Sequence, residues 1–490
     1  MNYRIVAKYL SLFIVAGGLL MLPSAAWAVY FGEWRSLGAF AGSMLFSGLI
    51  GLALYRAGRN ASPQLFQREG LALVGLGWIL TAFVGALPYV FAGALGPIDA
   101  YFESMSGFTT TGSTVLRDIE ATDMSLLFWR SFTHWLGGMG IIVLFLAVLP
   151  YMGAGGKQLF KSETPGPDPH GLSPRIKDTA SFLYKIYLAM TVAQTLLLML
   201  AGMSFFDALC HTFATLGTGG FSTRQASIAA YDSLPIEIII VVFMVLAGAN
   251  FGLYFSMMRG RWSDFWKNTE WKAYLLILGC ATLLITVNLM GFQGSMPEAH
   301  VHAKSHYDFG HALRVAAFQV VSIMTTTGFA TDDFHEWPHF SRTLLVLLMF
   351  VGGCAGSTGG GLKVVRILIL MKTAYWRLES TFRPKTVRAL RINREVVDDE
   401  VQKAVYGLFV LYVAFFAFGS LFMSLLGLPF QSALTSVATT LNNVGPGLEL
   451  VGPVRDFSLV PATGKLFLSL CMVVGRLELF TIGVMFIPSF

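Results

Sequence analysis

Long apolar stretches, each about the length of a membrane-spanning helix, follow one another through most of this 490-residue chain. A helix needs roughly 20 apolar residues to cross a hydrocarbon core about 30 Å thick. The pattern predicts spans at residues 5–28, 37–56, 70–93, 125–151, 180–203, 234–258, 272–292, 342–372, 402–427 and 464–488. No polar linker between them is long enough to separate soluble domains. The sequence therefore predicts an all-α polytopic membrane protein.

Four shorter apolar segments lie between paired spans, and each is predicted to be a helix that runs into a glycine turn. The terminal glycines are Gly112, Gly220, Gly328 and Gly445, and an alanine stands at the same distance before each, at Ala100, Ala208, Ala316 and Ala433. Self-similarity at a nearly constant interval indicates a repeated structural unit. We predict four pseudo-symmetric helix–pore-loop–helix repeats around a central pore, preceded by two N-terminal helices.

This interpretation divides the chain into five regions. The N-terminal pair occupies residues 1–60, and the repeats occupy 61–153, 178–260, 270–375 and 400–490. The four pore loops are predicted at residues 109–114, 217–222, 325–330 and 442–447.

Composition and charge agree with a membrane setting and predict an orientation. Hydrophobic residues make up 55% of the chain, charged residues only 13%, and the mean hydropathy is +0.63. Lys and Arg gather in alternate loops, most densely between Lys363 and Arg394. Because such loops face the cytoplasm, we expect both termini to be cytoplasmic and the pore loops to lie on the outer side. The net charge of +6 then reflects topology, and we expect no nucleic-acid partner.

The first span also resembles a cleavable signal peptide, because a basic start precedes an apolar stretch and the small-residue run Ala25–Ala28. The apolar stretch is long for a signal peptide, and its removal would upset the alternation of charge. We therefore expect a retained helix.

The glycine turns have the residue types of a cation filter. Irregular backbone at membrane depth is tolerated where it is packed in protein or lines water, and its carbonyl oxygens can replace the hydration shell of a monovalent cation. Glycine reaches backbone angles that let successive carbonyls point the same way. A single such glycine would more simply be a helix-packing contact, but four in matching register favour a filter. The predicted filter residues are Thr110, Thr111, Gly112, Thr218, Gly219, Gly220, Thr326, Thr327, Gly328, Asn443, Val444 and Gly445.

The span at 342–372 contains a run of glycines and small polar residues, and we predict a helix break there, beneath the filter. A phosphate-binding P-loop would need Gly-Lys followed by Ser or Thr, and the run lacks it. Tight helix packing through small residues is the alternative. The predicted gate residues are Gly352, Gly353, Gly356, Gly359, Gly360, Gly361 and, from the last span, Arg476.

Arg476 lies near the middle of the span at 464–488. A central arginine costs at least ~2.5 kcal/mol on insertion scales, so it should face the pore or a polar partner. Glu478 is two residues further along and does not share its face. A purely structural buried pair is the alternative to a role in the pore.

Other polar residues carry weaker signals. An outer-loop group could bind a metal, although a solvated loop is the simpler interpretation; its members are His300, His302, His306 and His311. Glu103 could attract cations to the outer mouth or serve as a cap or packing residue. The basic segment 373–400 suits either a cytoplasmic docking surface or anionic lipid headgroups.

The four loop motifs together resemble those of the Trk/Ktr/HKT superfamily of potassium transporters, over nearly the whole chain. The matching runs are Phe108–Ser113, Leu216–Phe221, Thr325–Ala330 and Asn442–Pro446. The resemblance implies potassium as the transported ion, a homodimer in the bacterial inner membrane, and a cytoplasmic nucleotide-binding (NAD/ATP-type) regulatory subunit of the TrkA kind. It also implies that the loop at 352–362 obstructs the pore and that Arg476 is a positive barrier near it. In this family a serine at the position of Gly112 accompanies sodium transport, so glycine favours potassium.

Two alternatives remain open at this point, and a third is not favoured. The chain could be a secondary transporter of another small solute, although such proteins typically show two repeats and intramembrane carboxylates for coupling. It could be a sodium-permeable member of the same fold. A membrane-embedded enzyme would need a nucleophile, an acid–base pair or a metal set, and we expect neither enzymatic activity nor a cofactor on this chain.

Overall fold

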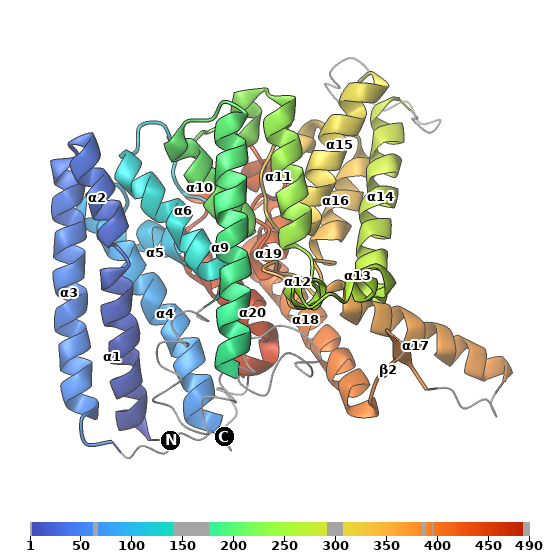
Figure 1. The fold of residues 1–490 in the computed structure, drawn as a ribbon, viewed down its shortest axis with the longest axis horizontal. Coiled ribbons are helices and arrows are strands. Elements are labelled where there is room, and N and C mark those ends of the chain that lie inside the picture. The colour runs from blue at the N-terminus through green and yellow to red at the C-terminus, as the bar shows by residue number, and fades with distance from the viewer. Residues whose placement is uncertain are drawn as a thin grey trace.

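The computed structural model describes residues 2–61, 67–140, 176–291, 307–383, 389–393 and 395–483. The described part is an assembly of helices with one two-residue strand pair (Figure 1). The N-terminal helices are α1 (Tyr3–Leu19), α2 (Leu22–Phe31) and α3 (Trp34–Gly58). Among the described residues, six helices are long and apolar enough to span a membrane, or seven if one bent pair counts as a span. The chain is a polytopic α-helical membrane protein, as the apolar pattern predicted.

The rest of the described chain forms four sets of helices. In each set, a short helix stands between a preceding long helix and one or two following helices. The first two sets are α4 (Gln67–Phe91), α5 (Pro97–Phe108), α6 (Met124–Gly138), and α9 (Ile176–Leu200), α10 (Phe205–Leu216), α11 (Leu234–Ala247), α12 (Phe251–Met258). The other two are α14 (Thr269–Leu289), α15 (Phe309–Met324), α16 (His339–Met349), α17 (Val364–Phe382), and α18 (Asp399–Leu425), α19 (Phe430–Leu441), α20 (Ala462–Gly483). The ends of the spans predicted at 125–151 and 464–488 lie outside the described residues.

Short elements connect these helices. They are α13 (Trp262–Lys267), the antiparallel strands β1 (Arg391–Ile392) and β2 (Glu395–Val396), and the 3₁₀ helices Ser227–Tyr231, Phe334–Glu336, Glu449–Val451 and Phe457–Leu459.

The aligned alanines explain how the short helices reach the centre of the assembly. Ala100, Ala208, Ala316 and Ala433 have no exposed surface at all. A small side chain lets neighbouring backbones approach closely within a membrane. In each short helix the alanine methyl group therefore packs in the interior. The turn that follows each helix lies in the same central region.

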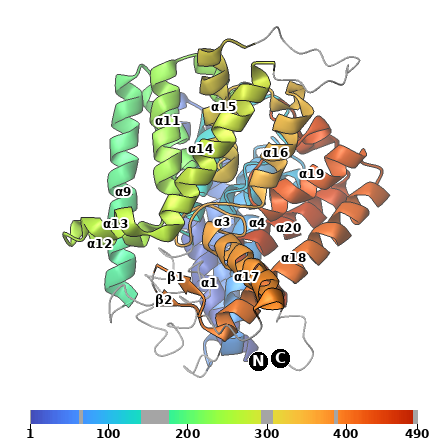
Figure 2. The same cartoon turned by 90° about the vertical axis from the view of Figure 1, so that its right-hand side faces the viewer.

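Two of the predicted spans within the repeats are broken. The helix is interrupted between Met349 and Val364, where the glycine-rich run predicted a break. The predicted span at 234–258 is not one helix, however, because α11 and α12 meet at an angle of 88°. Figure 2 shows α12 and α13 lying across the direction of α11 and α14.

Two contacts cause the bend between α11 and α12. The Gly248 carbonyl accepts a hydrogen bond from the Cys354 amide (2.8 Å), and the Asn250 side chain accepts the Gly252 amide (2.8 Å) and caps α12. The apolar pattern of 234–258 is compatible with a straight helix, so the prediction of a single span was wrong. The pattern does not reveal the contact between Gly248 and Cys354, which lies far along the chain.

The N-terminal pair packs through small residues. On the α3 face toward α1, Ser43 and Ser47 are buried and bond to carbonyls of their own helix. A Cβ atom on Gly51 would lie 2.4 Å from Val15 Cγ2, whereas Gly48 has nothing within 4 Å of that position. Gly51 is therefore a point of close approach between the two helices.

We expect Gly51→Leu to lower the Tm of the detergent-solubilised protein, because overpacking a close contact typically costs ~1–3 kcal/mol. Gly48→Leu, on the exposed side of the same helix, is the matched control and should leave the Tm nearly unchanged. Equal Tm values for the two variants in a thermal unfolding assay would show that the contact between α1 and α3 is not a tight one.

Candidate functional site

The short helices α5, α10, α15 and α19 end in the same hydrogen-bonded turn. In each, the amide of the residue before the terminal glycine donates to a carbonyl in the last helical turn. The bonds are Thr111 N to Ser106 O, Gly219 N to Ala214 O, Thr327 N to Ser322 O and Val444 N to Thr439 O, each 2.8 Å long. This is the geometry of a helix closed by one left-handed residue.

Two left-handed residues follow in each turn, with one ordinary residue between them. The first are Thr110, Thr218, Thr326 and Asn443, with φ of 54°, 53°, 61° and 54°. The second are Gly112, Gly220, Gly328 and Gly445, with φ of 85°, 76°, 85° and 103°. For a β-branched threonine this conformation is strained and persists only where the surroundings impose it. The four turns thus share one backbone shape.

The four turns meet as a closed ring. A Cβ atom on Gly112 would lie 2.0 Å from Gly219 O, and one on Gly220 would lie 2.0 Å from Thr327 O. One on Gly328 would lie 2.1 Å from Val444 O, and one on Gly445 would lie 2.8 Å from Thr111 O. Each glycine therefore faces the backbone carbonyl of the next turn, and the fourth turn returns to the first. We call residues 109–114, 217–222, 325–330 and 442–447 loops 1 to 4, and their assembly the ring.

Short polar side chains support the ring from behind. The hydroxyls of Thr109 and Thr111 share a hydrogen bond of 2.8 Å, and those of Thr325 and Thr327 share one of the same length. Asn443 Nδ2 donates to Thr111 Oγ1 (2.9 Å) and to Met472 O (3.0 Å). These side chains are completely buried, so their hydrogen bonds join the loops to one another and to α20 within the protein.

The segment 350–363, which we call the crossing loop, lies against the helix ends beside the ring. The Gly360 amide donates to Thr326 Oγ1 (2.7 Å). A Cβ atom on Gly360 would lie 2.4 Å from Asn442 O, and one on Gly352 would lie 2.5 Å from Gly360 O. The crossing loop therefore contacts loops 3 and 4, and Gly352 near its beginning contacts Gly360 near its end.

The crossing loop also satisfies the broken end of α11. Besides the bond from Cys354 to Gly248, the Phe251 amide donates to Gly356 O (3.1 Å) and Thr358 Oγ1 donates to Ala247 O (3.2 Å). Backbone groups that a helix break leaves without partners are costly in a membrane. Here the backbone groups exposed by one broken span form hydrogen bonds with the other broken span.

Arg476 joins the crossing loop to two further helices. From the middle of α20 its guanidinium donates to Thr358 O (2.7 Å), Gly137 O (2.6 Å) and Gly138 O (3.3 Å). A positive charge thus lies against backbone carbonyls of the crossing loop and of the end of α6. The side chain of Glu478 lies outside the described part of the structure.

A sequence model of the family described as TrkH, a cation transport protein, matches residues 40–489. The chain belongs to the TrkH family. It is 38% identical to the Trk system potassium uptake protein TrkH of Escherichia coli, over 100% of this chain and 99% of the relative. It is 31% identical to the Trk system potassium uptake protein TrkG of the same organism, over 99% and 98% of the two chains.

The fold is also similar to a solved member of the TrkH family. The crystal structure of the potassium transporter TrkH from Vibrio parahaemolyticus matches with a TM-score of 0.87 and 34% identity, covering 100% of this chain and 99% of that one. The resemblance and the fold class inferred from the sequence are therefore confirmed. Because the family consists of transport proteins, the expectation that the chain is not an enzyme is confirmed as well.

In this TrkH-family chain, His134 and Glu103 lie behind the ring, and the sequence analysis missed the role of His134. His134, at the end of α6, stacks on Phe221 with 4.0 Å between ring centroids, and a Cβ atom on Gly219 would lie 2.4 Å from its Nδ1. Glu103 is fully buried, which fits the cap or packing role that the sequence analysis gave as the alternative to attracting cations. A buried polar residue on the short helix was the signal that could have identified it.

The histidine group in the predicted outer loop is only partly visible. His300, His302 and His306 lie outside the described residues, and His311 stacks on Tyr307 at 5.0 Å between centroids. Within the described ranges, no group of three or more His, Cys, Asp or Glu residues could hold a metal ion.

We expect Thr326→Val to loosen the crossing loop, because the Gly360 amide would lose its acceptor. An unsatisfied buried donor costs ~1–3 kcal/mol, so brief opening should become about tenfold more frequent. Alkylation of Cys354, which is 1% exposed, should accelerate accordingly when followed by mass spectrometry. The Cys280→Ser background removes the exposed cysteine.

Thr286→Val is the control, because that hydroxyl bonds only within its helix, to Thr282 O (2.8 Å). Equal labelling of Cys354 in both variants would mean that the Thr326 hydroxyl does not hold the crossing loop.

Proposed function

We propose that the ring is a potassium-selective filter and that the chain mediates potassium uptake. The closed contact of each glycine with the next loop's carbonyl carries this proposal, because it joins the four loops in one ring to which each contributes backbone oxygens. Such oxygens can replace the hydration shell of a monovalent cation. The relatives named as potassium uptake proteins support potassium as the ion. The filter residues are those predicted above, and potassium is cargo rather than a resident cofactor.

The crossing loop is the gate in this proposal. Its contacts with Thr326 and Asn442 place it at the helix ends of loops 3 and 4, where it would obstruct an ion leaving the filter. Its glycines, Gly352, Gly353, Gly356, Gly359, Gly360 and Gly361, allow the close approaches and sharp turns of this segment. Arg476 adds a positive charge beside the same loop. The two together would keep the pathway closed until the loop moves.

Regulation and assembly complete the proposal. We infer a homodimer in the bacterial inner membrane, with cytoplasmic termini and a nucleotide-binding regulatory partner of the TrkA kind on that side. The names of the relatives refer to a Trk system, that is, to more than one component. The start of α1 and the end of α20 lie on the same side of the molecule (Figure 1). A cavity of about 510 Å³, whose lining includes Arg377, Arg383 and Asp399, lies between α17 and α18 within the predicted docking segment.

Gly112→Ser tests the filter. A side chain at this left-handed position would lie against Gly219 O, so the ring should widen or tilt. A distortion worth ~1.4 kcal/mol changes a binding ratio about tenfold, and we expect the preference for rubidium over sodium to fall by roughly that factor. Fluxes of both ions into proteoliposomes measure it.

Gly260→Ser is the matched control, because Gly260 is also left-handed but has nothing near its Cβ position. It should leave the ion preference unchanged. If Gly112→Ser behaves like this control, loop 1 does not belong to the filter.

Arg476→Gln tests the barrier. Repulsion between unit charges at 4 Å in an effective dielectric of 20 is about 4 kcal/mol, and water and carbonyls reduce it further. Removing the charge should raise rubidium flux per protein molecule severalfold, without changing the preference for rubidium over sodium.

Arg476→Lys separates charge from tethering, because lysine keeps the charge but cannot span Thr358 O and Gly137 O together. Low flux in Arg476→Lys and high flux in Arg476→Gln is the expected pair of results. High flux in both would assign the effect to the tether, and unchanged flux in Arg476→Gln would remove the barrier from the mechanism.

A further inference from the structure

One position recurs behind all four loops. At the same distance before each terminal glycine, the short helices carry Glu103, His211, Gln319 and Ser436, and each of them is completely buried. Three of the four bond to the last residue of their own loop or to the residue after it: Thr114 Oγ1 donates to Glu103 (2.9 Å), Ser222 Oγ pairs with His211 Nε2 (2.9 Å), and Gln319 Nε2 donates to Thr331 Oγ1 (3.4 Å). A polar side chain on the helix therefore holds the exit of the loop.

Loop 1 differs from the others because its holding residue is a carboxylate. Glu103 Oε2 also accepts the Val115 amide (2.8 Å), so the backbone just after loop 1 is tied to α5. Its counterion is Arg130 on α6, whose Nε lies 2.6 Å from Glu103 Oε1, and the two side chains are 0% and 2% exposed. A buried charge of this kind persists only when it is paired and hydrogen-bonded.

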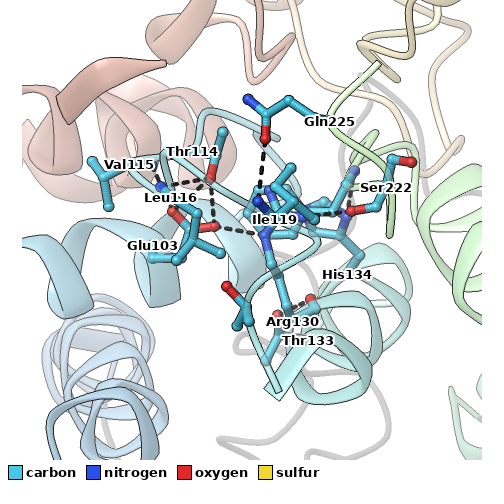
Figure 3. A network of polar contacts seen from close by, with 12 residues as sticks. Glu103, Thr114, Val115, Leu116, Ile119, Arg130, Thr133, His134, Ser222 and Gln225 are labelled. Carbon is cyan, nitrogen blue, oxygen red and sulfur yellow. Dashed lines mark hydrogen bonds and ion pairs between the residues drawn. The ribbon is translucent and has the colours of Figure 1, made fainter. Parts of the chain in front are cut away.

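The same guanidinium continues across to loop 2, as Figure 3 shows. Arg130 Nη1 donates to Ser222 O (2.9 Å), and Arg130 Cζ lies 3.6 Å from the centroid of the Phe221 ring. Arg130 thus holds the exits of loops 1 and 2 at once. These are the two loops that meet where Gly112 faces Gly219 O.

We propose that Glu103 and Arg130 are positioning residues that set the spacing between loops 1 and 2, and so determine how strictly the ring selects potassium over sodium. This rests on the proposed filter function. Neither side chain contacts the ion; the pair acts through the carbonyl of Ser222 and the amide of Val115. Without this ion pair, loops 1 and 2 can move apart where Gly112 meets Gly219 O. Sodium, the smaller ion, is then excluded less strictly.

A purely structural pair would stabilise the fold and leave selectivity alone. The matched control is the pair of Arg314 on α15 and Glu237 on α11, with Arg314 Nε 2.7 Å from Glu237 Oε2. The hydrogen bonds of Arg314 go to Glu237 and Asp232, so it joins α15 to α11 through a more exposed ion pair, with Arg314 27% exposed, and does not hold a loop exit.

The experiment measures the ratio of rubidium to sodium flux in proteoliposomes, together with the Tm, for the full chain. Arg130→Gln should lower the ratio about tenfold, as expected for losing charge-assisted hydrogen bonds. Arg130→Lys keeps the charge but not the span from Glu103 to Ser222, and should lower the ratio by less. Arg314→Gln should reduce the Tm but leave the ratio within about twofold of the unmodified protein.

Arg130→Gln alone leaves Glu103 without its counterion and can fail to fold, so the double variant Glu103→Gln/Arg130→Gln is included. It removes both charges, and replacing a buried pair as a whole is often tolerated. We expect a folded protein with a lowered ratio.

An unchanged ratio in the folded double variant would overturn the positioning role. If Gly112→Ser still lowers the ratio in that case, the filter proposal stands and only this inference fails. If neither the double variant nor Gly112→Ser changes the ratio, the filter proposal itself is wrong.

Discussion

The ring depends on one constraint: four backbone turns must approach one another more closely than any side chain allows. The distance from an added Cβ to the next loop's carbonyl would be 2.0 to 2.8 Å at the four terminal glycines. Glycine alone lacks that atom, and it also adopts the positive φ at these positions without strain. The threonines and the asparagine that precede the glycines have no such freedom. Their left-handed conformation must be imposed by the helices and loops packed around them.

The helices behind the ring supply that support through buried polar contacts. In a membrane interior, backbone and side-chain polar groups need partners within the protein, and the side chains of Thr109, Thr111 and Asn443 find theirs on neighbouring loops and helices. The support is not fourfold symmetric. Loop 1 is held by a charged pair, loops 2 and 3 by His211 and Gln319, and loop 4 by Asn443 through its bonds to Thr111 and Met472. Similar backbones are thus held by dissimilar side chains.

The crossing loop couples this ring to the rest of the molecule. Two broken spans exchange backbone hydrogen bonds where Cys354 meets Gly248 and Phe251 meets Gly356. Arg476 extends the connection to the end of α6. A movement of the crossing loop would therefore disturb its contacts with α11, with loops 3 and 4 and, through Arg476, with the end of α6.

The sequence by itself determined the class of helical membrane protein, the four glycine turns and the break at the glycine-rich run. Each of these carries a local signal: apolar length for a helix in lipid, a recurring glycine where the backbone must turn, and clustered glycines where a helix cannot continue.

Only the tertiary structure decided which groups meet. The bend between α11 and α12, the acceptors of Arg476 and the reach of Arg130 to loop 2 all depend on backbone amides and carbonyls from distant parts of the chain. Arg476 and Gly137, for example, are 339 residues apart. A backbone carbonyl is chemically the same at nearly every residue. The residue type that carries the carbonyl therefore does not reveal that a distant side chain donates a hydrogen bond to it. For that reason Glu103 was open to interpretation as a surface charge until its buried partners were placed around it.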